Sequence, residues 1–267
     1  MSQIIQALSS NGKDDLKALA AASLLANSGI TLSTGNYIVT VSLNTPKKDL
    51  TLIFDTGNTL TWTHVSRARD LATLNPTRYQ CRYTIIYSNS SFSRGFFTTK
   101  KLTISPMDAI DNFEFDCGKY NRGLFGGAAR LIGLSDDNIS IVGETATKYG
   151  KYFSYCLAST TSSTGHLTFG EDCGASSLVS FTPLSKVPQS SQFYGIKIVG
   201  ISVGGNLFSS GGAVIDSGTV IAQLPPTAYI ALRTAFRKAM ANYMTAPALA
   251  FLDTCYEFSK RAPSWSR

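Results

Sequence analysis

Apolar and polar residues alternate along most of the chain from Tyr37 onward. The stretch 37–43 is rich in β-branched residues and lies between Gly35 and Pro46. Similar stretches follow, separated by turn residues, at 50–54, 60–65, 81–87, 95–104, 113–117, 165–169, 193–203 and 213–216. Many short strands with a period of two and frequent turns are typical of all-β proteins. The sequence therefore predicts an all-β fold with a few short helices.

Helices are expected in three places. An Ala- and Leu-rich stretch predicts one over 14–26, and Gly150 closes a second over 140–149. A third starts after two prolines and runs over 227–244. Its large apolar residues recur at helical spacing and predict a core-facing stripe of Tyr229, Leu232, Phe236, Met240 and Tyr243.

One motif occurs twice. Residues 52–60 read Leu-Ile-Phe-Asp-Thr-Gly-Asn-Thr-Leu, and residues 213–221 read Ala-Val-Ile-Asp-Ser-Gly-Thr-Val-Ile. Each copy places an Asp at the end of an apolar strand, where a carboxylate is costly unless it is paired and hydrogen-bonded. The repeat therefore predicts two related lobes that each offer one carboxylate, Asp55 and Asp216, to a shared site.

A close carboxylate pair is suited to acid–base chemistry. Two such groups cannot both ionise easily, so one keeps a proton while the other is charged. The charged one can take a proton from water, and the other can donate one to a substrate carbonyl. Gly57 and Gly218 allow tight turns that expose backbone N–H groups. Thr56 and Ser217 can hydrogen-bond between the two loops, and Thr219 can hydrogen-bond Asp216.

Bulk composition limits the other function classes. Hydrophobic residues make up 43% of the chain and charged residues 15%, so a packed core is expected. Apolar runs are too short for a membrane span. The net charge is +7, but Lys and Arg are scattered and are not interleaved with aromatic residues along the chain. Nucleic-acid binding is therefore not expected, and no cofactor or metal motif is present.

Two other readings compete with the carboxylate pair. Gly-Ile-Ser-Val-Gly at 200–204 matches the nucleophile elbow of serine hydrolases, but a hairpin-type Gly-Gly-Asn follows where a helix is required. The only histidines, His64 and His166, are expected to be structural. The second reading is a chain without catalysis, either one that binds peptides or proteins through an incomplete cleft or an inactive product of a truncated gene. DNA binding is a further alternative.

The chain resembles the plant nepenthesin-like aspartic proteases, a pepsin-like group that includes the chloroplast nucleoid DNA-binding aspartyl proteases. The resemblance runs from about residue 35 to 260. Besides the two Asp motifs, it rests on Gly-Asn-Tyr-Ile-Val-Thr-Val at 35–41, Gly-Leu-Phe-Gly-Gly at 123–127, Leu-Ile-Gly-Leu at 131–134, Phe-Ser-Tyr-Cys-Leu at 153–157, Gly-His-Leu-Thr-Phe-Gly at 165–170, Phe-Tyr-Gly-Ile at 193–196, Val-Gly-Gly at 203–205, Leu-Pro-Pro-Thr-Ala-Tyr at 224–229 and Leu-Asp-Thr-Cys-Tyr at 252–256.

The resemblance implies a bilobal β-fold and an aspartic endopeptidase that uses an Asp-activated water on peptide or protein substrates. Tyr87 corresponds to the tyrosine of the substrate-covering flap, and Trp62 to the tryptophan that hydrogen-bonds it. Segment 131–133 corresponds to the strand beside the first Asp loop. The implied lobes are 35–185 and 186–267, after a possible propeptide remnant at 1–34. A monomer is expected, located in the secretory pathway, outside the cell or in plastids.

Four departures from the family pattern stand out. Asn58 replaces the usual Ser, although its amide could still hydrogen-bond Asp55. The flap segment 87–91 reads Tyr-Ser-Asn-Ser-Ser without the usual glycines. A cysteine-rich insertion after Trp62 is missing. The last residues, 260–267, do not match, so the C-terminal lobe is expected to be truncated and marginally stable.

The five cysteines are Cys81, Cys117, Cys156, Cys173 and Cys255, an odd number that leaves at least one thiol unpaired within the chain. Two disulfides among them could be arranged in several ways, between which the sequence does not choose. Asn89 and Asn138 lie in N-glycosylation patterns. The N-terminus lacks the features of an intact signal peptide.

Overall fold

The computed structural model describes residues 4–7 (backbone only), 20–43, 47–64, 82–87, 90–123, 130–170, 180–188, 191–208, 211–249 and 252–258. The chain forms two compact units. Unit 1 comprises Met1–Ile196 and Val214–Val220, and unit 2 comprises Lys197–Ala213 and Ile221–Arg267. These units are defined by packing alone. The lobe limits given above, 35–185 and 186–267, stay a prediction, as does the propeptide at 1–34.

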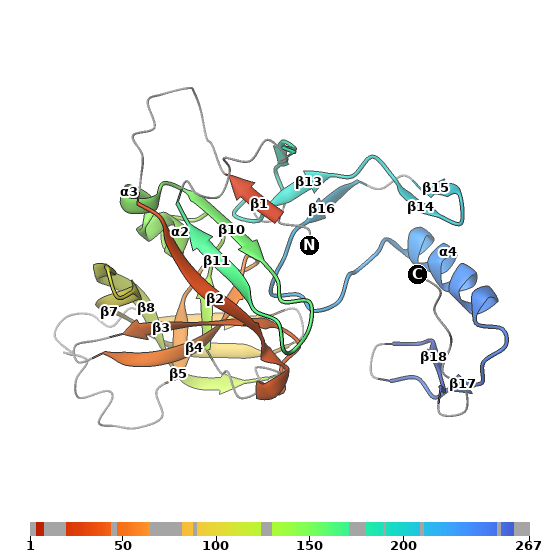
Figure 1. Cartoon of the computed structure of the whole chain (residues 1–267), viewed down its shortest axis with the longest axis horizontal. Coiled ribbons are helices and arrows are strands. Elements are labelled where there is room, and N and C mark those ends of the chain that lie inside the picture. The colour runs from red at the N-terminus through yellow and green to blue at the C-terminus, as the bar shows by residue number, and fades with distance from the viewer. Residues whose placement is uncertain are drawn as a thin grey trace. The chain divides into compact units, whose positions relative to one another are not determined.

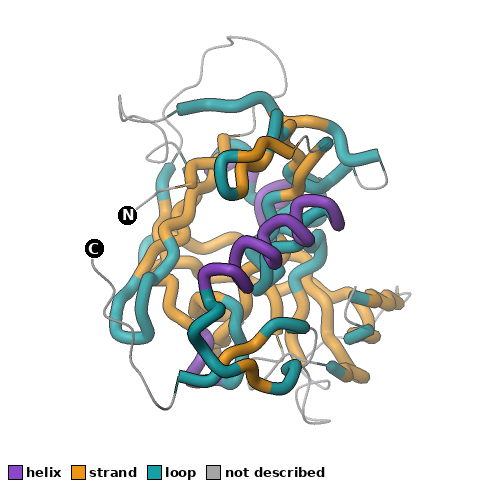
Figure 2. Tube along the Cα trace, turned by 90° about the vertical axis from the view of Figure 1, so that its right-hand side faces the viewer, coloured by secondary structure: helices purple, strands orange, loops and turns teal. Residues whose placement is uncertain are grey.

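Strands dominate the described chain (Figures 1 and 2). The strands are β1 (Ile4–Ala7), β2 (Ala22–Ser28), β3 (Tyr37–Leu43), β4 (Lys48–Asp55), β5 (Trp62–His64), β6 (Arg82–Ile86), β7 (Phe92–Ser105), β8 (Asp108–Arg122), β9 (Arg130–Gly133), β10 (Tyr152–Cys156), β11 (Gly165–Phe169), β12 (Leu184–Ser185), β13 (Gly195–Lys197), β14 (Ile201–Val203), β15 (Asn206–Phe208), β16 (Gly212–Val214), β17 (Thr245–Ala246) and β18 (Cys255–Tyr256). The helical segments are η1 (Gly29–Leu32), α2 (Ile141–Glu144), α3 (Ala146–Tyr149) and α4 (Pro226–Ala239). The predicted all-β class is confirmed.

Unit 1 is built on an 11-stranded sheet with the order β1-β10-β11-β2-β3-β4-β9-β5-β8-β7-β6. Most neighbours are antiparallel, but β4 pairs with β9 and β5 with β8 in parallel. The long β7–β8 ribbon contains three register shifts, each of which bends the strands locally. The strand expected over 37–43 coincides with β3, and the one expected over 165–169 with β11.

The helix expected over 14–26 is wrong where the chain is described. Residues 22–28 form β2, which pairs with β11 and β3. Ala22, Leu24 and Ala26 are buried, while Ser23 and Leu25 are exposed. This alternation fits a strand on a core, and the tertiary ladder outweighs the helical preference of Ala and Leu.

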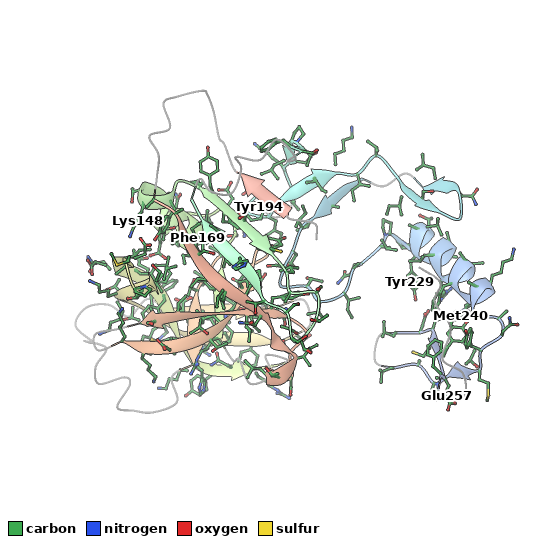
Figure 3. The ribbon with its side chains drawn as sticks, viewed as in Figure 1. Lys148, Phe169, Tyr194, Tyr229, Met240 and Glu257 are labelled. Atoms are coloured by element: carbon green, nitrogen blue, oxygen red, sulfur yellow. The ribbon has the colours of Figure 1, made fainter. Side chains whose placement is uncertain are left out.

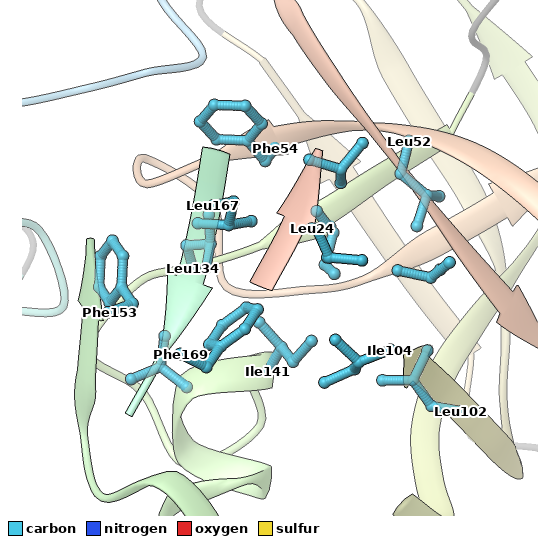
Figure 4. Packing of buried hydrophobic residues seen from close by; sticks show 14 of the residues in the cluster. Leu24, Leu52, Phe54, Leu102, Ile104, Leu134, Ile141, Phe153, Leu167 and Phe169 are labelled. Atoms are coloured by element: carbon cyan, nitrogen blue, oxygen red, sulfur yellow. The ribbon is translucent and has the colours of Figure 1, made fainter. Parts of the chain in front are cut away.

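The core of unit 1 lies between the layers that the curved sheet brings together. Leu24, Leu52, Phe54, Leu167 and Phe169 come from three strands, β2, β4 and β11, and gather there (Figure 4). Fully burying one such side chain contributes about 1.5–3 kcal/mol. Phe54 is wholly buried and directly precedes Asp55, so the core fixes the end of β4.

The helix expected over 140–149 is present as two short pieces. Ser140 caps α2 by accepting a hydrogen bond from Gly143 N at 3.2 Å. Thr145 interrupts the helix, and its hydroxyl donates to Ile141 O at 2.6 Å. Gly150 follows α3 with φ +64°, a conformation that glycine adopts without strain.

Unit 2 contains α4, the β14–β15 hairpin and the β17–β18 pair. Figure 3 labels Tyr229 on α4 and Met240 directly after it, so the helix ends before the predicted limit at 244. Of the predicted core stripe only Met240 is buried, while Tyr229, Leu232 and Phe236 are exposed. The core-facing prediction is therefore wrong for most of the stripe. Segment 252–258 contacts this face, with Tyr229 donating to Asp253 at 2.5 Å and the Phe236 and Tyr256 rings 5.7 Å apart, but it leaves these side chains exposed. None of the described helices is long and apolar enough to cross a membrane.

The serine-hydrolase reading is contradicted. Ser202 lies on β14, and the β14–β15 hairpin follows through Gly204 and Gly205 at φ +57° and +81°. A nucleophile elbow needs a helix directly after the serine. His64 and His166 are exposed residues at strand positions.

Three of the cysteines are in the described residues, and none of these three forms a disulfide. Cys117 is buried, and Cys156 and Cys255 are half-buried. Cys81 and Cys173 lie outside the described residues, as does the glycosylation candidate Asn89. The second candidate, Asn138, is exposed.

Candidate active site

Asp55 is the last residue of β4, and β9 runs parallel beside it. The register pairs Asp55 with Gly133, and Leu134 N donates to Asp55 O at 2.9 Å. A Cβ on Gly133 would lie 2.3 Å from Thr59 O, so only glycine allows β9 to approach the loop that follows β4 this closely. The predicted position of 131–133 beside the first Asp loop is confirmed.

Asp216 follows β16 and belongs to unit 1. Ile215 N donates to Tyr194 O at 2.9 Å. Tyr194 is buried, and its hydroxyl donates to Leu134 O at 2.6 Å. Tyr194 therefore connects the second Asp loop to the end of β9, next to the first Asp loop.

The two Asp loops hold each other through reciprocal hydrogen bonds. Thr56 N donates to Ser217 Oγ at 3.1 Å, and Ser217 N donates to Thr56 Oγ1 at 2.9 Å. Each hydroxyl also donates across the pair, Thr56 to Ile215 O and Ser217 to Phe54 O, both at 3.1 Å. These are the contacts expected for Thr56 and Ser217, and they keep the two loops in register.

Backbone and hydroxyl donors orient the carboxylates. Gly57 N donates to Asp55 Oδ1 and Gly218 N to Asp216 Oδ1, each at 2.8 Å. Thr219 donates its hydroxyl to Asp216 Oδ2. A Cβ on Gly218 would lie 2.2 Å from Asp55 Oδ1, and one on Gly57 would lie 2.7 Å from Asp216 Oδ1. Each carboxylate therefore lies against the glycine backbone of the opposite loop.

Asp55 favours its protonated form. Burial, the charge of Asp216 and a hydrogen bond with the Asp216 carboxyl raise its pKa to about 8, while the Gly57 N–H opposes the shift. Only 7% of Asp55 is exposed. The pair is therefore arranged so that one proton stays on it across the acid range.

Tyr87 and Trp62 meet next to the first Asp loop. Trp62 is fully buried, and its Nε1 donates to the Tyr87 hydroxyl at 2.7 Å. Tyr87 follows β6, and backbone hydrogen bonds with Ser90 and Ser91 close the hairpin to β7. The hydrogen bond expected between Trp62 and Tyr87 is present.

Asn58 makes different contacts from those expected. Its Nδ2 donates to the Tyr87 hydroxyl at 2.9 Å, and its Oδ1 accepts from Leu60 N at 3.0 Å. With these bonds the amide is directed to Tyr87, and no described hydrogen bond joins it to the Asp55 carboxylate. Among the described residues, a side-chain hydroxyl donates to the carboxylate of Asp216 but not to that of Asp55, so the two carboxylates differ in environment.

A cavity of about 570 Å³ opens over the pair. Apolar and polar residues share its lining, which consists of Asn36, Ile53, Asp55, Gly57, Asn58, Thr59, Leu60, Ile85, Ile86, Tyr87, Leu131, Gln192, Phe193, Asp216, Gly218 and Thr219. This size lies in the range of ligand pockets. In the part of the chain that the structure describes, no group of His, Cys, Asp and Glu residues is suited to hold a metal ion.

The sequence analysis missed Asn36 as a site residue. Its Nδ2 donates to Gly218 O at 2.7 Å, and its Oδ1 accepts from Thr34 at 2.7 Å. Asn36 lies in the Gly-Asn-Tyr-Ile-Val-Thr-Val motif at 35–41, which supports the family resemblance and by itself indicates no role in the site. Its hydrogen bond to a residue far away in sequence could not be inferred from spacing.

Solved structures share this fold. Basic 7S globulin from soybean superimposes with a TM-score of 0.71 at 18% identity, covering 89% of this chain and 76% of its own. An aspartic proteinase from Irpex lacteus superimposes with a TM-score of 0.63 at 19% identity, covering 85% and 69%. At this identity the likeness shows the fold alone, which is the bilobal all-β fold of pepsin-like proteins.

Sequence comparisons define the family. Residues 67–171 match the family described as xylanase inhibitor N-terminal, and residues 193–265 match xylanase inhibitor C-terminal. An aspartyl protease family protein of Arabidopsis thaliana is 42% identical over 92% of this chain, and aspartyl protease AED1 of the same plant is 41% identical over 96%. Nepenthesin-2 of Nepenthes gracilis is 26% identical over 84%. The chain belongs to the pepsin-like aspartic proteases of plants, the family that includes nepenthesin.

The chain covers only part of its relatives. It spans 60% of the first Arabidopsis protein and 62% of AED1. Family membership is therefore shown for this chain, whereas the activity of the full-length relatives comes to it only as a proposal.

Proposed function

We propose that the chain is an aspartic endopeptidase in which Asp55 and Asp216 activate a water molecule against a peptide bond. The observation that carries the proposal is the carboxylate pair itself. Each Asp is held by a glycine N–H of its own loop, and the loops are joined by the reciprocal Thr56 and Ser217 hydrogen bonds.

The different surroundings of the two carboxylates support separate roles. Asp55 holds the shared proton, because burial and its partner's charge raise its pKa to about 8. Asp216 accepts hydrogen bonds from Gly218 N and Thr219, which stabilise a charged carboxylate. Asp216 is therefore the general base and Asp55 the general acid at the first step.

The reaction balances with water as the only co-substrate. Asp216 takes a proton from the water molecule while the water oxygen bonds to the peptide carbonyl carbon. At the same step Asp55 gives its proton to the carbonyl oxygen. When the tetrahedral intermediate breaks down, Asp216 returns its proton to the leaving nitrogen. Asp55 takes back the hydroxyl proton, so the pair is regenerated.

The cavity lining supports a preference for apolar side chains on either side of the cleaved bond. Leu60, Ile85, Ile86, Leu131 and Phe193 supply apolar surface. Tyr87, at the β6–β7 hairpin, is proposed as the flap residue over the substrate, with Trp62 as the side chain that positions it.

The proposal is tested by cleavage of an unfolded protein substrate at acid pH. Asp55→Asn and Asp216→Asn keep the side-chain volume but cannot share a proton, and both are expected to abolish cleavage. A statine-type analogue, which resembles the tetrahedral intermediate, should inhibit the unmodified chain. Cleavage by either folded variant would contradict the assignment.

Peptide or protein binding without catalysis is the alternative function. Two observations favour it: the matching family models are described as those of xylanase inhibitors, and Asn58 lacks a side-chain hydrogen bond to Asp55. A folded chain that binds unfolded protein but never cleaves it, at any pH from acid to neutral, would support this alternative.

The remaining expectations from the family are proposals of the same kind. They are a monomeric protein, placed in the secretory pathway, outside the cell or in plastids. Disulfides and N-linked sugars were also expected from secretory relatives. Cys117, Cys156 and Cys255 form no disulfide in the structure, and Cys81 and Cys173 lie outside the described residues.

A further inference from the structure

The three strands β6, β7 and β8 present a surface that the active site does not use. We call it the arginine face and define it by Arg82, Phe92, Arg94, Phe96, Tyr120 and Arg122. The register pairs Arg82 with Phe96, Arg94 with Tyr120, and Phe92 with Arg122, and residues directly opposite each other share a face of the sheet. All these side chains therefore lie on one side.

The cations form a diagonal row across the sheet. Arg94 on β7 lies opposite Thr84 of β6 and Tyr120 of β8. Arg82 lies two residues from Thr84 along β6, and Arg122 lies two residues from Tyr120 along β8. Diagonal neighbours of this kind are about 7–8 Å apart. The row is flanked by aromatic side chains, so cationic and aromatic groups interleave on the sheet although they do not along the sequence.

No residue that the structure describes neutralises the cations of this surface. Arg82, Arg94 and Arg122 are exposed, and their guanidinium groups make no ion pair with any residue that the structure describes. The strand segments 82–86, 92–96 and 117–122 contain no acidic residue. The face therefore carries a local excess of positive charge.

A β-bulge hollows the surface. The register shifts between Arg94 and Gly95, so Lys119 is an extra residue of β8 without a partner in register on β7. Its Nζ lies 5.8 Å from the centroid of the Tyr120 ring. A Cβ on Gly95 would lie 1.8 Å from Cys117 O, so this bend requires glycine. A cavity of about 660 Å³ results, with the half-buried Phe92 and Phe96 among its walls.

Hydrogen bonds on the opposite side of the same strands keep this surface rigid. The Tyr83 hydroxyl and Ser93 Oγ are 2.7 Å apart, and Ser93 donates to Asn121 Oδ1 at 2.6 Å. One residue from each of the three strands is thus connected. A surface organised before binding loses less entropy when a ligand binds.

We propose that the arginine face is a binding site for an extended protein segment in which acidic residues alternate with apolar or aromatic ones. Guanidinium groups bind carboxylates in a two-point geometry, and the hollow beside Phe92 and Phe96 accommodates an apolar side chain. Strand β6 is the outermost strand of the sheet among the described strands, so its edge can pair with the main chain of a peptide.

A peptide fits this surface better than a single-stranded nucleic acid does. Bases stack on the open faces of aromatic rings, but Phe92 and Phe96 are half-buried and only Tyr120 is widely exposed, at 60%. A strand edge offers main-chain donors and acceptors that a peptide matches and a sugar-phosphate chain does not.

Binding is tested on the full chain carrying Asp55→Asn, so that cleavage plays no part. The probe is a labelled synthetic peptide in which Glu alternates with Leu and Phe, and its control has Gln in place of Glu. The acidic peptide is expected to bind, and to bind more weakly as salt rises. Equal binding of the Gln peptide, or tighter binding of oligo(dT), would overturn the proposal.

Charge reversal locates the site. Arg94→Glu combined with Arg122→Glu is expected to weaken peptide binding about tenfold or more, since the charge-assisted hydrogen bonds to the peptide carboxylates are lost. Lys186→Glu combined with Lys197→Glu is the matched control, because both lysines are exposed and lie outside the face. If both double variants weaken binding equally, only net charge matters and the site is wrong.

Use of this site in substrate selection rests on the proposed function. In an active chain, an acidic segment fused beside the cleaved sequence should raise kcat/KM, and the double arginine variant should remove the gain while cleaving the unfused substrate normally. A chain that binds the peptide but cleaves nothing would contradict the peptidase proposal and leave the binding site intact.

Discussion

At the residue scale, the candidate active site depends on how closely two glycines let the loops approach. Gly218 lies against the Asp55 carboxylate, and Gly57 lies against that of Asp216. A side chain at either position would have to displace a carboxylate whose oxygens are already fixed by backbone N–H groups. The Asp-x-Gly pattern therefore reflects space as well as turn geometry.

Gly218→Ala is expected to disable the pair without unfolding the chain. Its Cβ would lie 2.2 Å from Asp55 Oδ1. A displacement of about 1 Å at reacting groups can cost about 100-fold in rate, so kcat/KM should fall by about that factor. Gly211→Ala is the control, since nothing lies within 4 Å of its added Cβ. Equal kcat/KM for the two variants would argue against the packing described for the site.

At the element scale, the sequence predicted strands well where one face is buried. The sequence pattern predicted the limits of β3 and β11 correctly, and the apolar residues 52–54 predicted the buried end of β4. It failed for β2, whose Ala and Leu residues favour helix until β11 and β3 supply a ladder. The stripe on α4 predicted burial, but segment 252–258 covers it only in part, through contacts of Tyr229 with Asp253 and of Phe236 with Tyr256. Site contacts made by Asn36 and Asn58 depend on residues distant in sequence, so local pattern could not predict them.

The hairpin of β6 and β7 gives a second prediction. Tyr87→Phe removes the acceptor that Trp62 Nε1 and Asn58 Nδ2 share. Because losing a hydrogen bond to a buried group costs about 1–3 kcal/mol, urea unfolding should show a decrease of that size. Tyr120→Phe on the exposed side of β8 should leave stability unchanged. Equal effects of the two changes would mean that the Tyr87 hydroxyl is not a structural acceptor.

At the scale of the whole molecule, buried carboxyls couple the fold to acid pH. Asp116 is wholly buried on β8, where the register pairs it with Trp62 of β5, and neither of its carboxyl oxygens has a hydrogen-bond partner among the described residues. Burial and the charges of Glu114 and Glu144 raise its pKa from 3.8 to about 8. Burial likewise raises the pKa of Glu144 to about 8. The folded state therefore keeps protons that the unfolded chain releases.

The resulting pH dependence has a definite sign. Between the ordinary carboxyl pKa and about 8, the native state binds more protons than the unfolded state, so the free energy of unfolding falls as pH rises. Urea unfolding from pH 4 to 8 should show this decline. Asp116→Asn should make it shallower, whereas Asp111→Asn on the exposed end of the same strand should not. Stability that rises with pH over this range would contradict the assigned protonation of Asp116.

The central claim is that Asp55 and Asp216 share a proton and use it to cleave peptide bonds. The most direct test is the pH profile of kcat/KM for a peptide substrate with apolar residues at the cleaved bond. We predict activity in the acid range that persists above the ordinary carboxyl pKa and declines towards about 8, as Asp55 loses its proton. Both Asp→Asn variants should be inactive at every pH. Activity that rises with pH towards neutral, or that survives in either variant, would contradict the account.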